Sequence, residues 1–152
     1  MAKPGHEWIC KSIVDNAPDA VVFADSDGII RLWNSGAEAI FGYSAQEALG
    51  QSLDIIIPEN LRGRHWEGYN KTMATGETKY GKDLLAVPGI RKDGSRISLE
   101  FSIVMVKDEN GQLLGPAAVL RDVTARWKKE KELKERLAAL EGGSSKRAAS
   151  PG

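Results

Sequence analysis

The chain has 152 residues, a length that favours a single domain, and 41% of them are hydrophobic, which is enough for a buried core. Acidic and basic residues balance at 21 each, so no global field attracts nucleic acid or an anionic membrane. No apolar run approaches the ~20 residues that span a bilayer, the N-terminus has no signal-peptide core, and Cys10 is the single cysteine. We therefore expect a cytoplasmic protein, or a cytoplasmic module of a larger one, without nucleic-acid or membrane partners.

The first third of the chain predicts a helix and a β-hairpin. After a flexible start at residues 1–6, apolar residues at helical spacing predict a helix over about residues 6–16. Residues 20–24 and 29–33 read as strands, and the Asp-Ser-Asp-Gly sequence at 25–28 is typical of the tight turn between them.

Two short helices are predicted between residues 35 and 49. Ser35 with Glu38 fits a capping box, Ser44 with Glu47 fits a second, and Gly42 can end the first helix because glycine accepts a left-handed conformation. Helices this short are not stable alone, so they need a sheet to pack on.

A longer helix and three strands follow. The helix is predicted from about Pro58 to Thr75, with Gly76 as its C-terminal cap. Strands are predicted at residues 79–90, 96–106 and 113–123, separated by turns at 92–94 and 108–111. The middle strand is the clearest, because apolar and polar residues alternate along it.

The composition changes after residue 124. Residues 125–141 are rich in Lys, Arg, Glu, Leu and Ala and predict an output helix that resembles a coiled coil. Its heptad seam takes in Val123, Glu130, Leu133, Leu137 and Leu140. Residues 142–152 are rich in Gly, Ser, Ala and Pro and are predicted to be a disordered tail or a linker.

No motif of an enzyme is present. The two histidines lie in no nucleophile or metal motif, and the sequence contains neither a P-loop nor a kinase or Gly-x-Ser-x-Gly signature. We therefore expect no enzymatic activity of this chain.

Three features near the middle of the chain resemble the signature of PAS sensor domains: Asn34, the Gly42-Tyr43 pair and the Glu-Ala-Leu-Gly sequence at 47–50. The resemblance implies an α+β PAS fold over residues 7–124, with a five-stranded antiparallel sheet and flanking helices. It also implies a signalling module, and Asp122, Val123 and Thr124 resemble the Asp-x-Thr hinge that relays the signal to an output helix. An effector of the histidine kinase, cyclase or chemoreceptor type is the implied partner.

A second resemblance concerns the predicted helix at 58–75. Pro58-Glu59, Arg62, Arg64 and His65 resemble the segment that carries the proximal ligand in haem-binding PAS domains of the FixL oxygen-sensor type. The implied cofactor is haem b with His65 as its iron ligand, since a neutral imidazole is a good axial donor.

Other residues of the haem site follow from the same resemblance and from periodicity. Tyr69 shares a helical face with His65, and Leu99, Phe101 and Ile103 would form an apolar wall opposite. Leu85 stands where the oxygen sensors carry a distal arginine, and Asp83 lies two residues earlier. Without an arginine to donate a hydrogen bond to bound oxygen, the resemblance favours carbon monoxide, nitric oxide or a redox change over oxygen as the signal that is sensed.

Two alternatives remain open: a cofactor-free PAS module for dimerisation and relay, and a PAS domain that binds a small organic ligand. A flavin photosensor is disfavoured because the expected helix has no cysteine. A parallel homodimer is expected in each case, because Trp8, Ile9 and Ile13 on the first helix and the leucines of the last need a partner.

Overall fold

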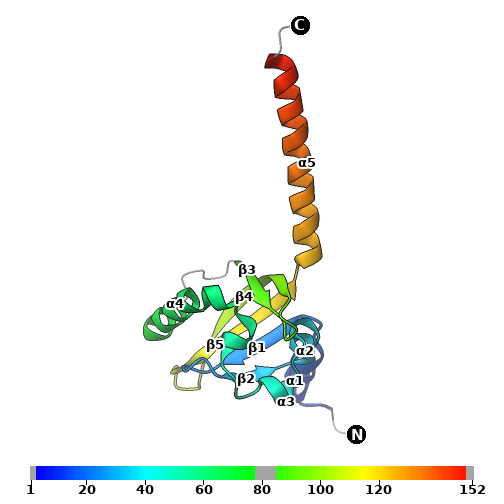
Figure 1. The fold of residues 1–152 in the computed structure, drawn as a ribbon. Coiled ribbons are helices and arrows are strands. Elements are labelled where there is room, and N and C mark those ends of the chain that lie inside the picture. The colour runs from blue at the N-terminus through cyan, green and yellow to red at the C-terminus, as the bar shows by residue number, and fades with distance from the viewer. Residues whose placement is uncertain (1–2, 78–84, 150–152) are drawn as a thin grey trace. The chain divides into compact units, whose positions relative to one another are not determined.

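The computed structural model describes residues 3–77 and 85–149, with the backbone alone at Leu85 and at 143–149. The chain divides into two compact units, one ending at Asp122 and one beginning at Val123. The first unit contains the sheet and the helices that cover it, and the second is one helix (Figure 1).

A five-stranded antiparallel sheet with the order β2-β1-β5-β4-β3 forms the centre of the first unit (Figure 1). This arrangement confirms the predicted fold class. The strands are β1 (Ala20–Ala24), β2 (Ile30–Trp33), β3 (Leu85–Ile90), β4 (Arg96–Lys107) and β5 (Leu113–Asp122). The predicted residues 79–84 of the third strand, with Asp83, lie outside the described residues.

The helices also match the predicted order. They are α1 (His6–Asn16), α2 (Ser35–Phe41), α3 (Ala45–Ala48), the 3-10 turns η1 (Leu53–Ile56) and η2 (Glu59–Leu61), α4 (Arg62–Thr75) and α5 (Thr124–Ala149). The predicted helix at 58–75 is thus a 3-10 turn that continues as α4. Gly42 and Gly76 end α2 and α4 in the left-handed conformation, as predicted.

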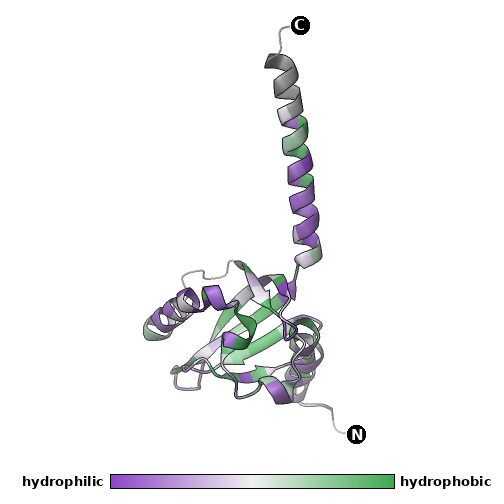
Figure 2. Cartoon of the chain, viewed as in Figure 1, coloured by the Kyte–Doolittle hydropathy of each residue, from purple (hydrophilic) through white to green (hydrophobic). Residues whose placement is uncertain are grey.

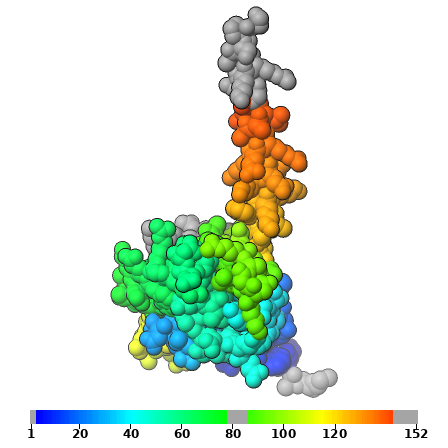
Figure 3. Space-filling model, in the orientation of Figure 1, coloured from blue at the N-terminus to red at the C-terminus, as the bar shows by residue number. Residues whose placement is uncertain are grey.

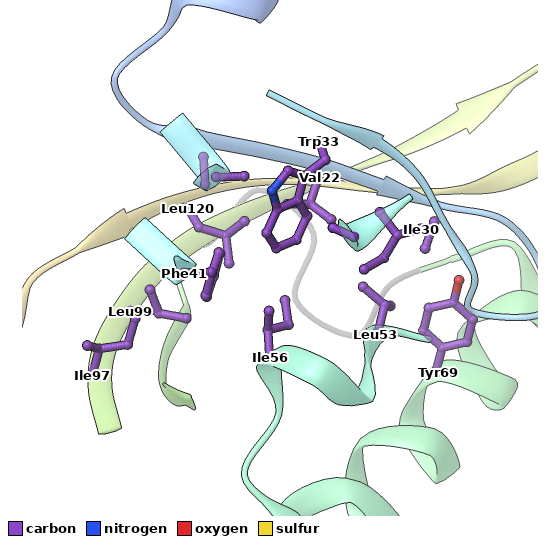
Figure 4. Close-up of a cluster of buried hydrophobic side chains, with 14 residues drawn as sticks. Val22, Ile30, Trp33, Phe41, Leu53, Ile56, Tyr69, Ile97, Leu99 and Leu120 are labelled. Carbon is purple, nitrogen blue, oxygen red and sulfur yellow. The ribbon is translucent and has the colours of Figure 1, made fainter. Parts of the chain in front are cut away.

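The core lies between one face of the sheet and the segment from α2 to α4 (Figure 4). Its central side chains include Val22, Trp33 and Phe41, and the apolar residues of β1 and β5 stand out in Figure 2. Along β4 the alternation that predicted a strand is real, since Ile97 and Leu99 are buried and Val104 is exposed.

The N-terminal cap of α2 differs from the prediction. Asn34, rather than Ser35, caps the helix, and its side-chain oxygen accepts from the backbone N–H of Ala37 at 2.9 Å. The predicted capping box at Ser35 and Glu38 is therefore wrong, because Glu38 instead accepts from the N–H of Ala45 at 2.8 Å. The second predicted box, at Ser44 and Glu47, is confirmed.

The C-terminal helix is longer than the sequence predicts. We expected the helix to end at residue 141 and a disordered tail to follow, but α5 runs to Ala149. Two glycines weaken a helix by about 1 kcal/mol each without having to stop it, and Lys, Arg and Ala beyond them are good helix formers. Within the part of the chain that the structure describes, no helix has the length and hydropathy of a membrane span.

Candidate functional site

Helix α4 carries the predicted site and forms one flank of the first unit (green in Figures 1 and 3). Pro58 precedes its first turns, and the Arg62 side chain donates from Nε to the Ile57 carbonyl at 3.1 Å. Most of the helix surface is exposed, and Tyr69 is its one buried residue. The position of the helix therefore depends on a few side chains that reach the body of the domain.

Trp66 provides the first of these connections. Its indole Nε1–H donates to the Asp54 carboxylate of η1 at 2.6 Å. Its ring also lies directly over Gly28 in the turn between β1 and β2, where a Cβ atom would come within 2.1 Å of the ring. Glycine at 28 is thus required both for the indole and for its own positive φ of 77°.

Tyr69 provides the second connection. Its hydroxyl donates to the backbone carbonyl of Asp25, again in the turn between β1 and β2. Burial, together with the negative charges of Asp25 and Asp27, raises the pKa of Tyr69 to about 12. The hydroxyl therefore keeps its proton at neutral pH and remains a donor.

His65 is half-buried beside these two rings. Its ring centroid lies 4.8 Å from that of Trp66 and 5.7 Å from that of Tyr69, which confirms that His65 and Tyr69 share a helical face. Burial lowers the pKa of His65 below its ordinary value of 6.5, and the negative charge of Asp54 opposes this only in part. The imidazole is accordingly neutral at physiological pH.

The Nδ1 atom of His65 is buried and has no hydrogen-bond partner among the residues that the structure describes. Buried polar atoms are nearly always paired, so such an atom needs an explanation. A neutral imidazole also retains one nitrogen lone pair. The second ring nitrogen, Nε2, is therefore the one that could bind a group from outside the protein, and Nδ1 faces the protein.

The predicted apolar wall lies on β4. Leu99 is buried in the core, while Phe101 and Ile103 are half-buried. Leu85 pairs with Phe101 across β3 and β4, so the two backbones are in register. Leu99 and Tyr69 lie at opposite ends of the core cluster, with Ile56 between them (Figure 4). The structure thus places Phe101 and Leu85 together but does not place Leu99 beside Tyr69.

The predicted hinge lies at the end of the sheet. Asp122 is the last residue of β5, and Thr124 is the first of α5. The Asp122 carboxylate pairs with the guanidinium of Arg91 at 3.0 Å, a contact that sequence reasoning missed. The signal available in the sequence was only that Arg91 precedes a hairpin turn, and nothing local connects it with a residue 31 positions away.

The chain belongs to the PAS family, since the profile described as the PAS fold matches residues 10–123. It is therefore a sensory and signalling module, and the two predictions drawn from the PAS signature, its fold and its sensory class, are confirmed. The structure of the PAS domain of a protein from Colwellia psychrerythraea superposes with a TM-score of 0.69 at 26% identity, covering 80% of this chain and 99% of that one.

Among curated proteins, the sensor protein FixL of Bradyrhizobium diazoefficiens is 36% identical over 93 residues, which are 61% of this chain and 18% of FixL. The cell-division control histidine kinase PdhS of Brucella abortus is 30% identical over 132 residues, 87% of this chain and 12% of that protein. An uncharacterised protein of Azorhizobium caulinodans is 33% identical over 144 residues, 91% of this chain and 19% of its own length. The chain thus spans less than a fifth of each relative.

Proposed function

We propose that this PAS module binds haem b through His65 and senses a diatomic gas or a redox change. The observation that carries the proposal is the half-buried, neutral His65 on α4, because a neutral imidazole has a lone pair that can bind iron. The similarity to the sensor protein FixL, 36% identical over 93 residues, supports it, as does the resemblance of Pro58-Glu59, Arg62, Arg64 and His65 to the haem-binding type. When bound, haem supplies an iron whose open coordination position takes a small gas molecule.

The protein residues have separate roles in this proposal. His65 would hold the haem iron, and Tyr69 and Trp66 fix the rotation of α4 so that the imidazole keeps its orientation. Leu85, Leu99, Phe101 and Ile103 are the proposed apolar residues of the cofactor site, and of the three on β4 Phe101 and Ile103 are more accessible than Leu99. An apolar surface suits the porphyrin, because burial of its flat hydrocarbon area is favourable.

Haem titration of the purified chain tests the assignment. Wild type should develop a Soret band, and His65→Ala should lose it or bind far more weakly, because the iron loses its only proposed protein ligand. His6→Ala is the matched control and should bind haem as wild type does. Far-UV circular dichroism should show that His65→Ala is folded. A wild-type spectrum and affinity in His65→Ala would refute the site.

The relay is proposed to run through Asp122, Val123 and Thr124 into α5. Asp122 ends the last core strand and is paired with Arg91, so a change in the sheet acts directly on the residue that precedes the helix. A bound group can shift this equilibrium only by its differential affinity for the two states. Because FixL and PdhS are named as sensor and kinase, we propose a histidine kinase as the effector.

A parallel homodimer is the proposed assembly. Trp8 and Ile13 on α1 are 62% and 65% exposed, and Leu133, Leu137 and Leu140 on α5 are exposed as well. Exposed apolar residues in rows on two helices indicate a protein partner. Light scattering on the full chain and on a version ending at Thr124 tests this, and a monomer at high concentration in both would refute it.

A cofactor-free relay module is the second candidate. It is favoured by the close packing of Leu99 with Gly89, where an added Cβ would lie 2.6 Å from the leucine, so this end of the inner face is filled by protein. A purified chain that stays colourless and takes up no haem would support this candidate. Binding of a small organic molecule, detected by mass spectrometry of the native protein, would instead support the ligand-binding alternative.

A further inference from the structure

His6 and Cys10 lie side by side on α1, away from the proposed sensory site. The Cys10 Sγ atom is 3.5 Å from Nε2 of His6, as the four-residue spacing of a helix allows, and both side chains are exposed. The helix is attached near its C-terminal end, where the carbonyls of Val14 and Asp15 accept from Asn34 and Ser35. Its N-terminal half therefore presents a thiol and an imidazole to solvent.

We propose that His6 and Cys10 form half of a tetrahedral metal site for Zn²⁺ or a similar borderline-soft divalent cation. In a tetrahedral site, bonds of about 2.3 Å to sulfur and 2.0 Å to nitrogen place the two ligand atoms about 3.5 Å apart. The observed separation is 3.5 Å. The pair can thus ligate one ion at its present spacing.

A second copy of the chain supplies the other half. In the part of the chain that the structure describes, no three metal-binding side chains are grouped together, so one chain offers two ligands at most. His6, Cys10 and Ile13 follow each other at steps of four and three, which is the spacing of a heptad seam, and Ile13 is 65% exposed. Two parallel α1 helices that pair along this seam bring two thiolates and two imidazoles to the same point.

The resulting Cys₂His₂ set is a common zinc environment. Binding releases the thiol proton of each Cys10 to solvent, and the two thiolates balance the charge of the cation. This inference rests on the α1 pairing of the proposed homodimer and does not depend on haem. It adds a metal requirement, or a metal-dependent strengthening, to the assembly.

Titration of the reduced full chain with Co²⁺ tests the proposal. Wild type should show thiolate-to-cobalt charge-transfer absorption, saturate at one ion per two chains and become dimeric. Cys10→Ser should lose the charge-transfer band. Cys10→His keeps a ligand at this position and should still bind one ion per two chains without that band. Glu7→Gln, which changes an exposed carboxylate on the same helix, is the control and should behave as wild type.

Two results would overturn the inference. One is a Co²⁺ spectrum that Cys10→Ser leaves unchanged, because the thiol would then not be a ligand. The other is saturation at one ion per chain without dimer formation, because the second copy would then contribute nothing. The failure of haem to bind would refute the proposed function but would leave these measurements unaffected, so the two failures are distinguishable.

Discussion

Replacement of Asn34 by alanine should destabilise the domain more than the loss of an ordinary helix cap. The Asn34 Oδ1 atom accepts from the N–H groups of Val21 at 2.8 Å and Ala37 at 2.9 Å. Its Nδ2 donates to the carbonyls of Val14 at 2.7 Å and Asp19 at 3.0 Å. One buried side chain, 4% exposed, thus joins α1, β1 and α2.

The magnitude follows from these contacts. Asn34→Ala leaves two N–H groups without their acceptor, at about 1–2 kcal/mol each when buried, so we expect a loss of about 2–4 kcal/mol in the free energy of unfolding. Ser44→Ala is the control, because it removes an exposed cap of α3 at a cost of about 1 kcal/mol. Asn34→Asp keeps an acceptor but turns a carboxylate towards carbonyls, so it should also be destabilised.

Urea unfolding followed by far-UV circular dichroism measures all three variants. The linear extrapolation gives each free energy of unfolding, and equal slopes show that the comparison is valid. If Asn34→Ala lost no more stability than Ser44→Ala, the reasoning from its multiple buried bonds would be refuted. If Asn34→Asp matched wild type, the two donated bonds would contribute nothing.

Three further predictions concern the α4 region. Because burial lowers the pKa of His65 below 6.5, the imidazole binds a proton more readily in the unfolded chain than in the folded one. The free energy of unfolding should therefore fall as the pH drops through 6.5, and His65→Gln should flatten this slope in urea unfolding between about pH 5 and 8. Gly28→Ala should be strongly destabilising, since its Cβ would lie 2.1 Å from the Trp66 ring, but less so when combined with Trp66→Ala. If the costs simply added in a double-mutant cycle, the contact would be unimportant. A haem-loaded chain should bind carbon monoxide more tightly than oxygen in gas titrations, because Phe101 and Ile103 offer no hydrogen-bond donor, and a stable oxygen complex would contradict this.

The fold could be predicted because its signals are local. Alternation along β4, glycines at the turns and the cap at Ser44 each act within a few residues, and each is found where expected. The cap of α2 could not be predicted in the same way, since Asn34 and Ser35 are both good N-cap residues. The choice between them is made by distant carbonyls, at Val14 and Asp19, to which the Asn34 side chain donates.

In the candidate site, too, the local features could be predicted from the sequence and the long-range contacts could not. The spacing of His65 and Tyr69 predicts their common face, because both lie on one helix. The contacts that hold this helix could not be predicted, since Trp66 reaches Asp54 and Tyr69 reaches Asp25, 44 residues away. Such pairs depend on the packing of α4 against the turn between β1 and β2, which no local pattern encodes.

The ion pair of Arg91 with Asp122 should matter for the start of α5 more than for global stability. Their side chains are 38% and 24% exposed, and a pair of this kind contributes ~0–1 kcal/mol, so Arg91→Met should unfold close to wild type in urea. Asp122 is the first residue of the hinge, two residues before Thr124 begins α5, and a fixed negative charge near a helix N-terminus stabilises the first turn. Release of that carboxylate in Arg91→Met should therefore speed amide hydrogen exchange in the first turn of α5, where the N–H of Trp127 donates to the Val123 carbonyl at 2.8 Å.

Lys92→Met is the matched control. Lys92 lies beside Arg91 in the same hairpin turn, and its replacement breaks the ion pair with Glu47 but leaves Asp122 untouched. Equal exchange of the Trp127 amide in the two variants would show that Arg91 does not couple the sheet to the output helix.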